Sequence, residues 1–326
     1  MTARSASRIS SAGGWSMSAT QAARWPCGAS GGEAAACWRH LRPGLARSHA
    51  SSRRPRSRTA RPYRDREYRG GVPLPKKVKV GVQLWPQATS LAHMRRAWRE
   101  ADQMGVDSIW TWDHFYPLRG DPEERHFECY TLLAAMAADT SNARLGALVT
   151  CYSYRNANLL ADMARTIDHI SNGRFVLGLG SGWFERDYTE YGYEFGTAPG
   201  RLKALEKGIP TIKKRLAKLN PGPVHGKMPI MIGGSGEKVT LRLVAEHADM
   251  SNHFGPVDNF RKKNMILDEW CAKVGRDPRE IERTVAINPD DLQDAAGYAA
   301  VGADHLIIMI GAPYDLSPVK KFLEQR

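Results

Sequence analysis

The sequence predicts a (β/α)8 barrel (TIM barrel), and three observations point to it. Beyond residue 72, runs with an apolar residue at every second position alternate with runs of helical period. Eight strand-then-helix units fit into residues 73–326, close to the roughly 250 residues that such barrels use. The turn after the first strand, residues 84–87, holds no glycine, which argues against the alternative, a doubly wound nucleotide-binding sheet.

Each element follows from its own pattern. In the first strand Val78, Val80 and Val82 alternate with polar or small residues, and Thr89 is the expected N-cap of the helix that Gly105 ends. The strands are expected at residues 78–84, 108–112, 145–150, 175–179, 229–232, 249–252, 284–287 and 305–310. The helices are expected at residues 89–104, 127–138, 158–170, 201–216, 237–247, 259–274, 291–301 and 318–323.

Residues 1–72 differ in composition from the rest. They hold 14 Arg, no Lys and three acidic residues, so most of the net charge of +13 lies there. Such a segment buries too little apolar area to offset the entropy of ordering, so we expect a disordered extension over 1–72 and one barrel domain over 73–326. The segment fits a transit peptide, an Arg-rich nucleic-acid contact or, as the favoured interpretation, translation from a mis-set start.

The composition of the barrel segment excludes several classes of protein. It shows no cluster of basic residues, so we expect no nucleic-acid partner for it. No apolar run approaches the roughly 18–20 residues that span a bilayer, so we expect no membrane partner. The five Cys have no C-x-x-C spacing, and no His, Asp or Glu set has metal spacing. We therefore expect a cytoplasmic protein without a disulfide framework and without a metal.

Polar residues gather where the expected strands end, which is where barrels place their active sites. Gln83 has the inward-facing parity at the end of the first strand, and Asp113 and His114 follow the second. The imidazole of His114 can exchange a proton near neutral pH, which makes it a candidate acid or base. Neighbouring side chains of a strand diverge, so Asp113 and His114 cannot both point at one atom.

Two further strand ends are rich in glycine. The turn Gly233-Gly234-Ser235-Gly236 precedes a helix, whose free N–H groups favour an anion such as a phosphate. Glycines at 178, 180 and 182 either let a flat ligand approach the backbone or only relieve crowding inside the barrel. Since no metal site and no nucleophile elbow are present, we expect an organic cofactor to carry the chemistry.

Five segments, at residues 79–84, 112–115, 154–156, 177–184 and 232–238, resemble the luciferase-like monooxygenase superfamily. Within it, they are most similar to the actinobacterial branch that depends on the deazaflavin coenzyme F420. The resemblance implies an oxidoreductase that transfers a hydride between F420 and a small organic substrate. We expect the protein to be a homodimer. An FMN-dependent monooxygenase that uses molecular oxygen and a non-catalytic ligand-binding barrel remain alternatives.

The resemblance also implies roles for individual residues. It makes His114 and Asp113 catalytic and maps a non-proline cis peptide to Leu148–Val149. In a sugar-phosphate dehydrogenase of the superfamily a Trp and a Glu stand where this chain has Leu118 and Trp183, so we expect no oxidation of glucose 6-phosphate. The implied cofactor-binding residues are Gln83, Leu148, Val149, Thr150, Gly180, Ser181, Gly182, Gly233, Gly234, Ser235 and Gly236, and the expected substrate-binding residues are Trp85, Trp183, His253 and Phe254.

Overall fold

The structure, a computed structural model, describes residues 78–325. The strands are β1 (Lys79–Leu84), β2 (Ser108–Thr111), β3 (Arg144–Ala147), β4 (Thr150–Cys151), β5 (Phe175–Gly180), β6 (Ile230–Gly233), β7 (Met250–Phe254), β8 (Glu282–Ile287) and β9 (His305–Ile310). The α-helices are α1 (Leu91–Met104), α2 (Cys129–Asp139), α3 (Ala157–Ile170), α4 (Glu185–Tyr191), α5 (Ala198–Leu216), α6 (Thr240–His247), α7 (Val257–Val274), α8 (Ala295–Ala300) and α9 (Ser317–Glu324). Short 3-10 helices lie at Tyr152–Tyr154, Pro278–Glu280 and Pro289–Asp294.

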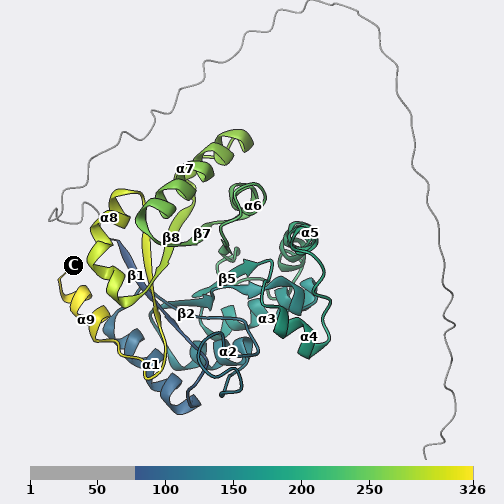
Figure 1. The fold of residues 1–326 in the computed structure, drawn as a ribbon. Helices are drawn as coiled ribbons and strands as arrows, with labels where there is room; N and C mark the ends of the chain where they lie inside the picture. The colour runs from purple at the N-terminus through teal and green to yellow at the C-terminus, as the bar shows by residue number, and fades with distance from the viewer. Residues whose placement is uncertain (1–77, 326) are drawn as a thin grey trace, which may run out of the picture. The chain divides into compact units, whose positions relative to one another are not determined.

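The strands form a closed parallel barrel with the helices around it (Figure 1). Their order is β3-β2-β1-β9-β8-β7-β6-β5-β4, and a pairing of β3 with β5 closes the ring. Because β3 and β4 both pair with β5, they share one place, and nine strand segments fill eight positions. The predicted fold is therefore confirmed. The expected extension over 1–72 and its boundary with the barrel lie outside the described residues.

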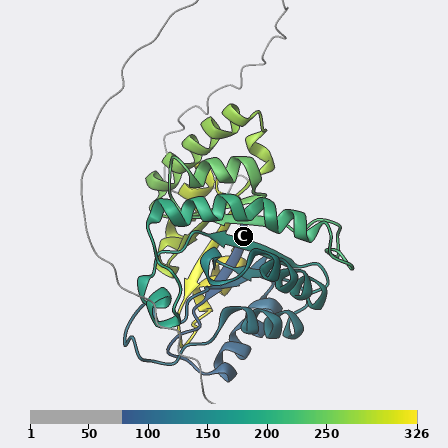
Figure 2. The same ribbon diagram turned by 90° about the vertical axis from the view of Figure 1, so that its right-hand side faces the viewer.

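The barrel is filled by side chains and has no open pore. Residues of one parity form an interior cluster, which Trp110, Val176, Met231 and Ile307 dominate. Residues of the other parity form a larger core between the strands and the surrounding helices. Figure 2 shows the ribbon of these strands and helices after a turn of 90°. Among residues 78–325 no helix has the length and apolar character to cross a membrane.

The amino-terminal end of the barrel is closed by an ion-pair network around Glu282. Its carboxylate accepts hydrogen bonds from Lys79 at 2.7 Å and from Arg144 at 2.8 Å, and it lies 2.9 Å from Nδ1 of His305. The other ring nitrogen of His305 contacts Oγ of Ser108 at 2.9 Å. The Glu282 carboxylate is paired with two cations and a buried imidazole, which favours a structural role. The chemistry is thus left to the carboxyl end, called the mouth below.

The expected boundaries were wrong at several ends. Ser90, rather than Thr89, caps α1, because its side chain accepts the N–H of His93. The strand expected at 145–150 is interrupted at Leu148–Val149 and appears as β3 and β4. The helix expected at 291–301 is a 3-10 turn followed by the shorter α8.

Helix α4 has no counterpart among the expected elements. It covers seven residues, fewer than an isolated helix needs to be stable in water, and its sequence is mostly polar. Contacts with the loop that follows β2 hold it in place, as described below. This unpredicted helix supplies a central residue of the site.

Candidate active site

His114 lies at the mouth, just after β2, and is held by a buried carboxylate. Its Nδ1 lies 2.7 Å from Oδ2 of Asp187, a residue of α4 that has no exposed side-chain surface. The same oxygen accepts a hydrogen bond from the hydroxyl of Tyr154 at 2.9 Å. The other carboxylate oxygen accepts the backbone N–H of Phe115 at 3.1 Å. Three segments far apart in the sequence therefore meet at one imidazole.

Aromatic rings surround the imidazole of His114. Trp183 and Phe184 meet it edge to face, at centroid distances of 5.7 and 5.6 Å, and Trp112 does so at 6.1 Å. Trp183 is 63% exposed, whereas the His114 side chain keeps 12% of its surface exposed. Within residues 78–325, Nδ1 is the only ring nitrogen of His114 with a hydrogen-bond partner. Nε2 is therefore left for a ligand.

Asp113 is turned away from His114 and forms a buried ion pair. Arg155 donates to both of its carboxylate oxygens, at 2.7 and 2.9 Å, and the N–H of Cys151 donates at 3.0 Å. Burial raises the pKa of the Asp113 carboxyl, and the Arg155 guanidinium opposes this shift. Because the bidentate geometry suits an ionised carboxylate, we assign Asp113 a charge at neutral pH. The catalytic role expected for Asp113 stays a prediction; in the structure its carboxylate joins Arg155 to the N–H of Cys151.

The interruption between β3 and β4 is a bulge with a cis peptide at Leu148–Val149, in the place that the resemblance implied. Gln83 stabilises it, since its Nε2 donates to the carbonyl oxygen of Leu148 at 2.8 Å. Thr150 follows the bulge, and its hydroxyl pairs with the hydroxyl of Tyr130 at 2.9 Å. Gln83 and Thr150 therefore have hydrogen bonds that hold the bulge in place.

The side chain of Val149 occupies space that two glycines leave open. A Cβ on Gly180 would lie 2.6 Å from Cγ2 of Val149, and one on Gly233 would lie 2.8 Å from its Cγ1. Gly182 has a φ of +80°, and a Cβ there would collide with the hydroxyl of Tyr188. For Gly180 and Gly182 these close approaches support crowding inside the protein, one of the two interpretations of the sequence, while contact with a flat ligand stays a prediction.

Replacing Gly180 by Ala is expected to lower the unfolding free energy by about 1–3 kcal/mol, because the new methyl group overpacks against Val149. The double variant Gly180→Ala/Val149→Ala removes the clashing methyl groups and is expected to recover most of this loss. Urea denaturation of the three proteins measures the effect. Equal losses in the single and double variants would mean that Val149 is not what Gly180 accommodates.

The turn Gly233–Gly236 follows β6 and leads towards α6, which begins at Thr240. Gly234, Ser235 and Gly236 are exposed, and Gly234 has a φ of +122° that side-chain-bearing residues rarely adopt. All strands of the ring are parallel, so this turn lies at the same end of the barrel as His114. The structure therefore brings the expected phosphate-binding turn and the expected proton-exchanging residue to one mouth.

Three of the four expected substrate residues lie at the carboxyl ends of their strands. Trp85 stacks on Trp112 at 5.4 Å, and Trp112 stacks on His126 at 6.5 Å. Trp183 lies beside His114, and Phe254, at the end of β7, is 53% exposed. These side chains give the mouth an aromatic character.

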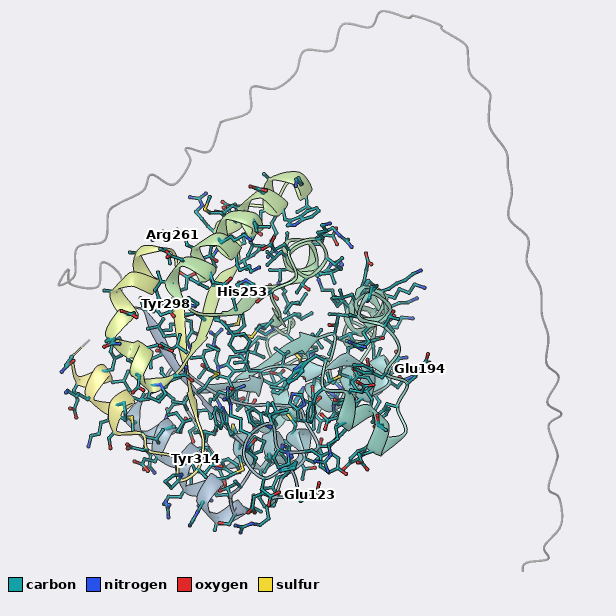
Figure 3. All side chains as sticks on the ribbon, viewed as in Figure 1. Glu123, Glu194, His253, Arg261, Tyr298 and Tyr314 are labelled. Atoms are coloured by element: carbon teal, nitrogen blue, oxygen red, sulfur yellow. The ribbon has the colours of Figure 1, made fainter. Side chains whose placement is uncertain are left out.

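His253 does not lie with these exposed side chains, and its expected substrate-binding role stays a prediction. His253, labelled in Figure 3, has the parity of β7 that faces the helices. Its ring centroid lies 6.3 Å from that of Phe260 in α7. The residue is fully buried, and both ring nitrogens lack a hydrogen-bond partner among the described residues. Burial, together with the charges of Lys263 and Arg283, lowers the pKa of His253 to about 4.

His253→Leu is expected to make the protein less sensitive to acid. The folded-state pKa lies below that of an unfolded His, so the unfolded state binds the proton first and stability falls as the pH drops from about 6.5 to about 4. The full effect of this shift is about 3 kcal/mol. Urea denaturation at pH 7, 6 and 5 should show a flatter decline for the variant. An unchanged decline would contradict the neutral, unpartnered state of His253.

Sequence reasoning missed Asp187 and gave Tyr154 and Arg155 no role. Asp187 is 73 residues from His114 in sequence, so no local spacing links them. The sequence did offer one signal for an acidic residue at the site: acidic side chains stand at positions 185 and 187, shortly after Gly182 and Trp183. Within the described part of the chain, no three His, Cys, Asp or Glu side chains are arranged to hold a metal ion.

Comparison with known proteins places this architecture in a family. The family model described as luciferase-like monooxygenase matches residues 77–290. The chain belongs to this family. Curated relatives include a 5,10-methylenetetrahydromethanopterin reductase of Methanolobus tindarius, 27% identical over 216 residues, covering 62% of each chain. A pyrimidine monooxygenase of Caulobacter vibrioides is 32% identical over 205 residues, covering 55% of this chain and 56% of the relative.

Solved structures share the luciferase-like fold. An F420-dependent secondary alcohol dehydrogenase with an F420-acetone adduct superposes with a TM-score of 0.63 at 15% identity, covering 76% of this chain and 98% of that one. A type II Baeyer-Villiger monooxygenase of Pseudomonas putida in complex with FMN superposes with a TM-score of 0.61 at 15% identity, covering 76% of this chain and 96% of that one. At this identity the likeness concerns the fold alone. The chain spans about three fifths of the length of the curated luciferase-like relatives it matches.

Proposed function

We propose that this luciferase-like protein is an oxidoreductase that transfers a hydride between coenzyme F420 and a small organic substrate. The observation that carries the proposal is the imidazole of His114, held by Asp187 at the mouth with Nε2 free. Hydride transfer to a carbonyl carbon, or from an alcohol carbon, requires a proton to be given to or taken from the oxygen. A positioned imidazole meets this requirement near neutral pH.

The residues at the mouth fit a flat ring with a phosphate-bearing tail. The side chain of Val149 offers a partly exposed apolar support, and the turn Gly233–Gly236 offers exposed backbone at residues 234–236, shortly before α6 begins. F420 would supply the hydride or accept it. The chain's own residues would hold the ring at the Val149 bulge, bind the phosphate at the turn, and hold or release a proton at Nε2 of His114.

A monooxygenase with bound FMN is the second candidate, because relatives of both kinds match at similar levels. The aromatic mouth suits a small organic substrate in either case. The sequence resemblance favours the F420-dependent branch, and we therefore place it first.

Titration of the purified full-length chain with F420, and separately with FMN, tests this choice. We expect saturable binding of F420, monitored through the change in its visible absorbance, and much weaker binding of FMN. Tight binding of FMN alone would favour the monooxygenase, and binding of neither would favour a barrel without this chemistry.

Compartment and assembly remain part of the proposal. The three described cysteines, Cys129, Cys151 and Cys271, are free and buried, which is compatible with the reducing cytoplasm. Sedimentation velocity tests the homodimer that we expect: a single species of one chain would contradict it.

A further inference from the structure

We propose that Asp187 is the positioning residue that fixes the tautomer of His114 and keeps its Nε2 free at the mouth. The inference concerns a residue of the unpredicted helix α4 that does not itself reach the mouth, since its side chain is fully buried. Only its kinetic consequence rests on the proposed function. The assignment of the tautomer rests on geometry alone.

The surroundings of Asp187 are those of an ionised carboxylate. Its two oxygens accept hydrogen bonds from the Tyr154 hydroxyl and the Phe115 N–H, and Oδ2 also lies 2.7 Å from Nδ1 of His114. Burial, together with the negative charges of neighbouring groups including Asp187, raises the pKa of Tyr154, so its hydroxyl keeps the proton that it donates. Because the Tyr154 hydroxyl and the Phe115 N–H both donate, the oxygens of Asp187 act as acceptors, which is the arrangement of an ionised carboxylate.

An ionised carboxylate accepts hydrogen bonds and donates none, so Nδ1 of His114 must carry the proton. In the neutral ring Nε2 then bears the lone pair, and it can take a proton from a ligand at the mouth. In the charged ring the same Nε2 carries the proton that it can return. Without Asp187 the ring is free to adopt the opposite tautomer or to rotate about its side-chain bonds.

Helix α4 is tied to the loop that follows β2, so Asp187 and His114 move together. Arg186 donates to the carbonyl oxygen of Pro122 at 2.9 Å, pairs with Glu123, and lies 3.9 Å from the ring centroid of Tyr116. Tyr191 stacks on Phe115 at 4.0 Å. These contacts hold the carboxylate in register with the imidazole.

The tautomer of the unmodified protein gives the first test. The full-length chain, without cofactor and with 15N-labelled histidine, is studied by NMR at a pH at which its imidazoles are neutral. His114→Gln identifies the signal by its loss. We expect His114 as the Nδ1–H tautomer alone. Observation of the Nε2–H tautomer, or of a mixture, would overturn the proposal whatever the cofactor is.

Asp187→Asn gives the second test, with Glu190→Gln as its matched control on the same helix, where the side chain is 50% exposed. Asp187→Asn is expected to yield a mixture of tautomers and a kcat lower by about 100-fold or more, with KM little changed. Glu190→Gln should retain both properties of the unmodified protein. Tautomers in Asp187→Asn that match those of Glu190→Gln would overturn the proposal.

Asp187→Ala distinguishes a positioning role from a purely structural one. The variant leaves room for a small carboxylate, so a positioning role predicts that formate restores part of the lost kcat in a saturable way, whereas a purely structural role predicts no rescue. Lack of rescue in a protein with unchanged circular dichroism would contradict the positioning role. If the tautomer is as expected but no F420-dependent turnover is found, the inference stands and the proposed function fails.

Discussion

His114→Gln is expected to lower kcat by about 100- to 10,000-fold, the usual contribution of a positioned acid or base. Gln fills a similar volume but exchanges no proton, so the chemical step loses its proton partner. Binding of the cofactor is expected to change by less than about threefold, since the bulge at Leu148–Val149 and the turn Gly233–Gly236 are untouched. Steady-state kinetics and a cofactor titration on the same preparations measure the two effects.

Two comparisons make the result of His114→Gln specific. His126→Gln serves as the control, because His126 also lies by Trp112, and burial lowers its pKa to about 4, so it stays neutral and is not expected to exchange protons. We expect a change in kcat of less than about tenfold for this variant. Equal losses in both variants, or a loss of cofactor affinity that accounts for the whole effect, would contradict the assignment of His114.

Arg155→Met is expected to destabilise the protein by about 3–5 kcal/mol, the largest effect on stability that we predict. The substitution leaves the carboxylate of Asp113 buried without its bidentate partner, while Met keeps most of the apolar volume. Arg155 also contacts Glu128 at 2.7 Å and lies 4.4 Å from the ring centroid of Tyr130, and both contacts are lost. Denaturation with guanidinium chloride measures the change.

The double variant Asp113→Asn/Arg155→Met separates these contributions. Removing the stranded charge is expected to recover about half or more of the lost stability, since an amide costs less to bury than a carboxylate. If the double variant is as unstable as Arg155→Met, the ion pair is not the source of the effect. Tolerance of Arg155→Met at wild-type stability would show that Asp113 is not buried as a charge.

The barrel could be predicted because its signals are local. Alternating apolar residues mark β1, and short apolar runs mark β5 and β9, while the spacing of strand and helix units fixes the number of repeats. The residues at the mouth could be predicted because they follow the carboxyl ends of those strands. The cis peptide at Leu148–Val149 was implied by family resemblance, and the residues alone gave no signal for it.

The partners of the site could not be predicted, because the contacts that select them are not local. Asp113 pairs with a guanidinium 42 residues away, and His114 with a carboxylate 73 residues away. The latter lies on a helix too short to show a periodic pattern. Tertiary packing determines both pairs, and neither the secondary-structure propensities nor a sequence motif predicts them.

The misplacement of His253 has a simpler cause. The sequence predicts that the strand ends at residue 252, which places His253 at the mouth. In the structure β7 continues to Phe254, and strict alternation turns His253 towards α7. Because β7 is longer than expected by two residues, the side chain of His253 is buried in the core.

A crystal structure of the full-length chain with F420 tests the central claim most directly. The account predicts the deazaflavin ring against Val149, with Nε2 of His114 facing the substrate side and the phosphate at the turn Gly233–Gly236. A ligand bound at the opposite end of the barrel, around Glu282, or a phosphate held away from that turn, would contradict it.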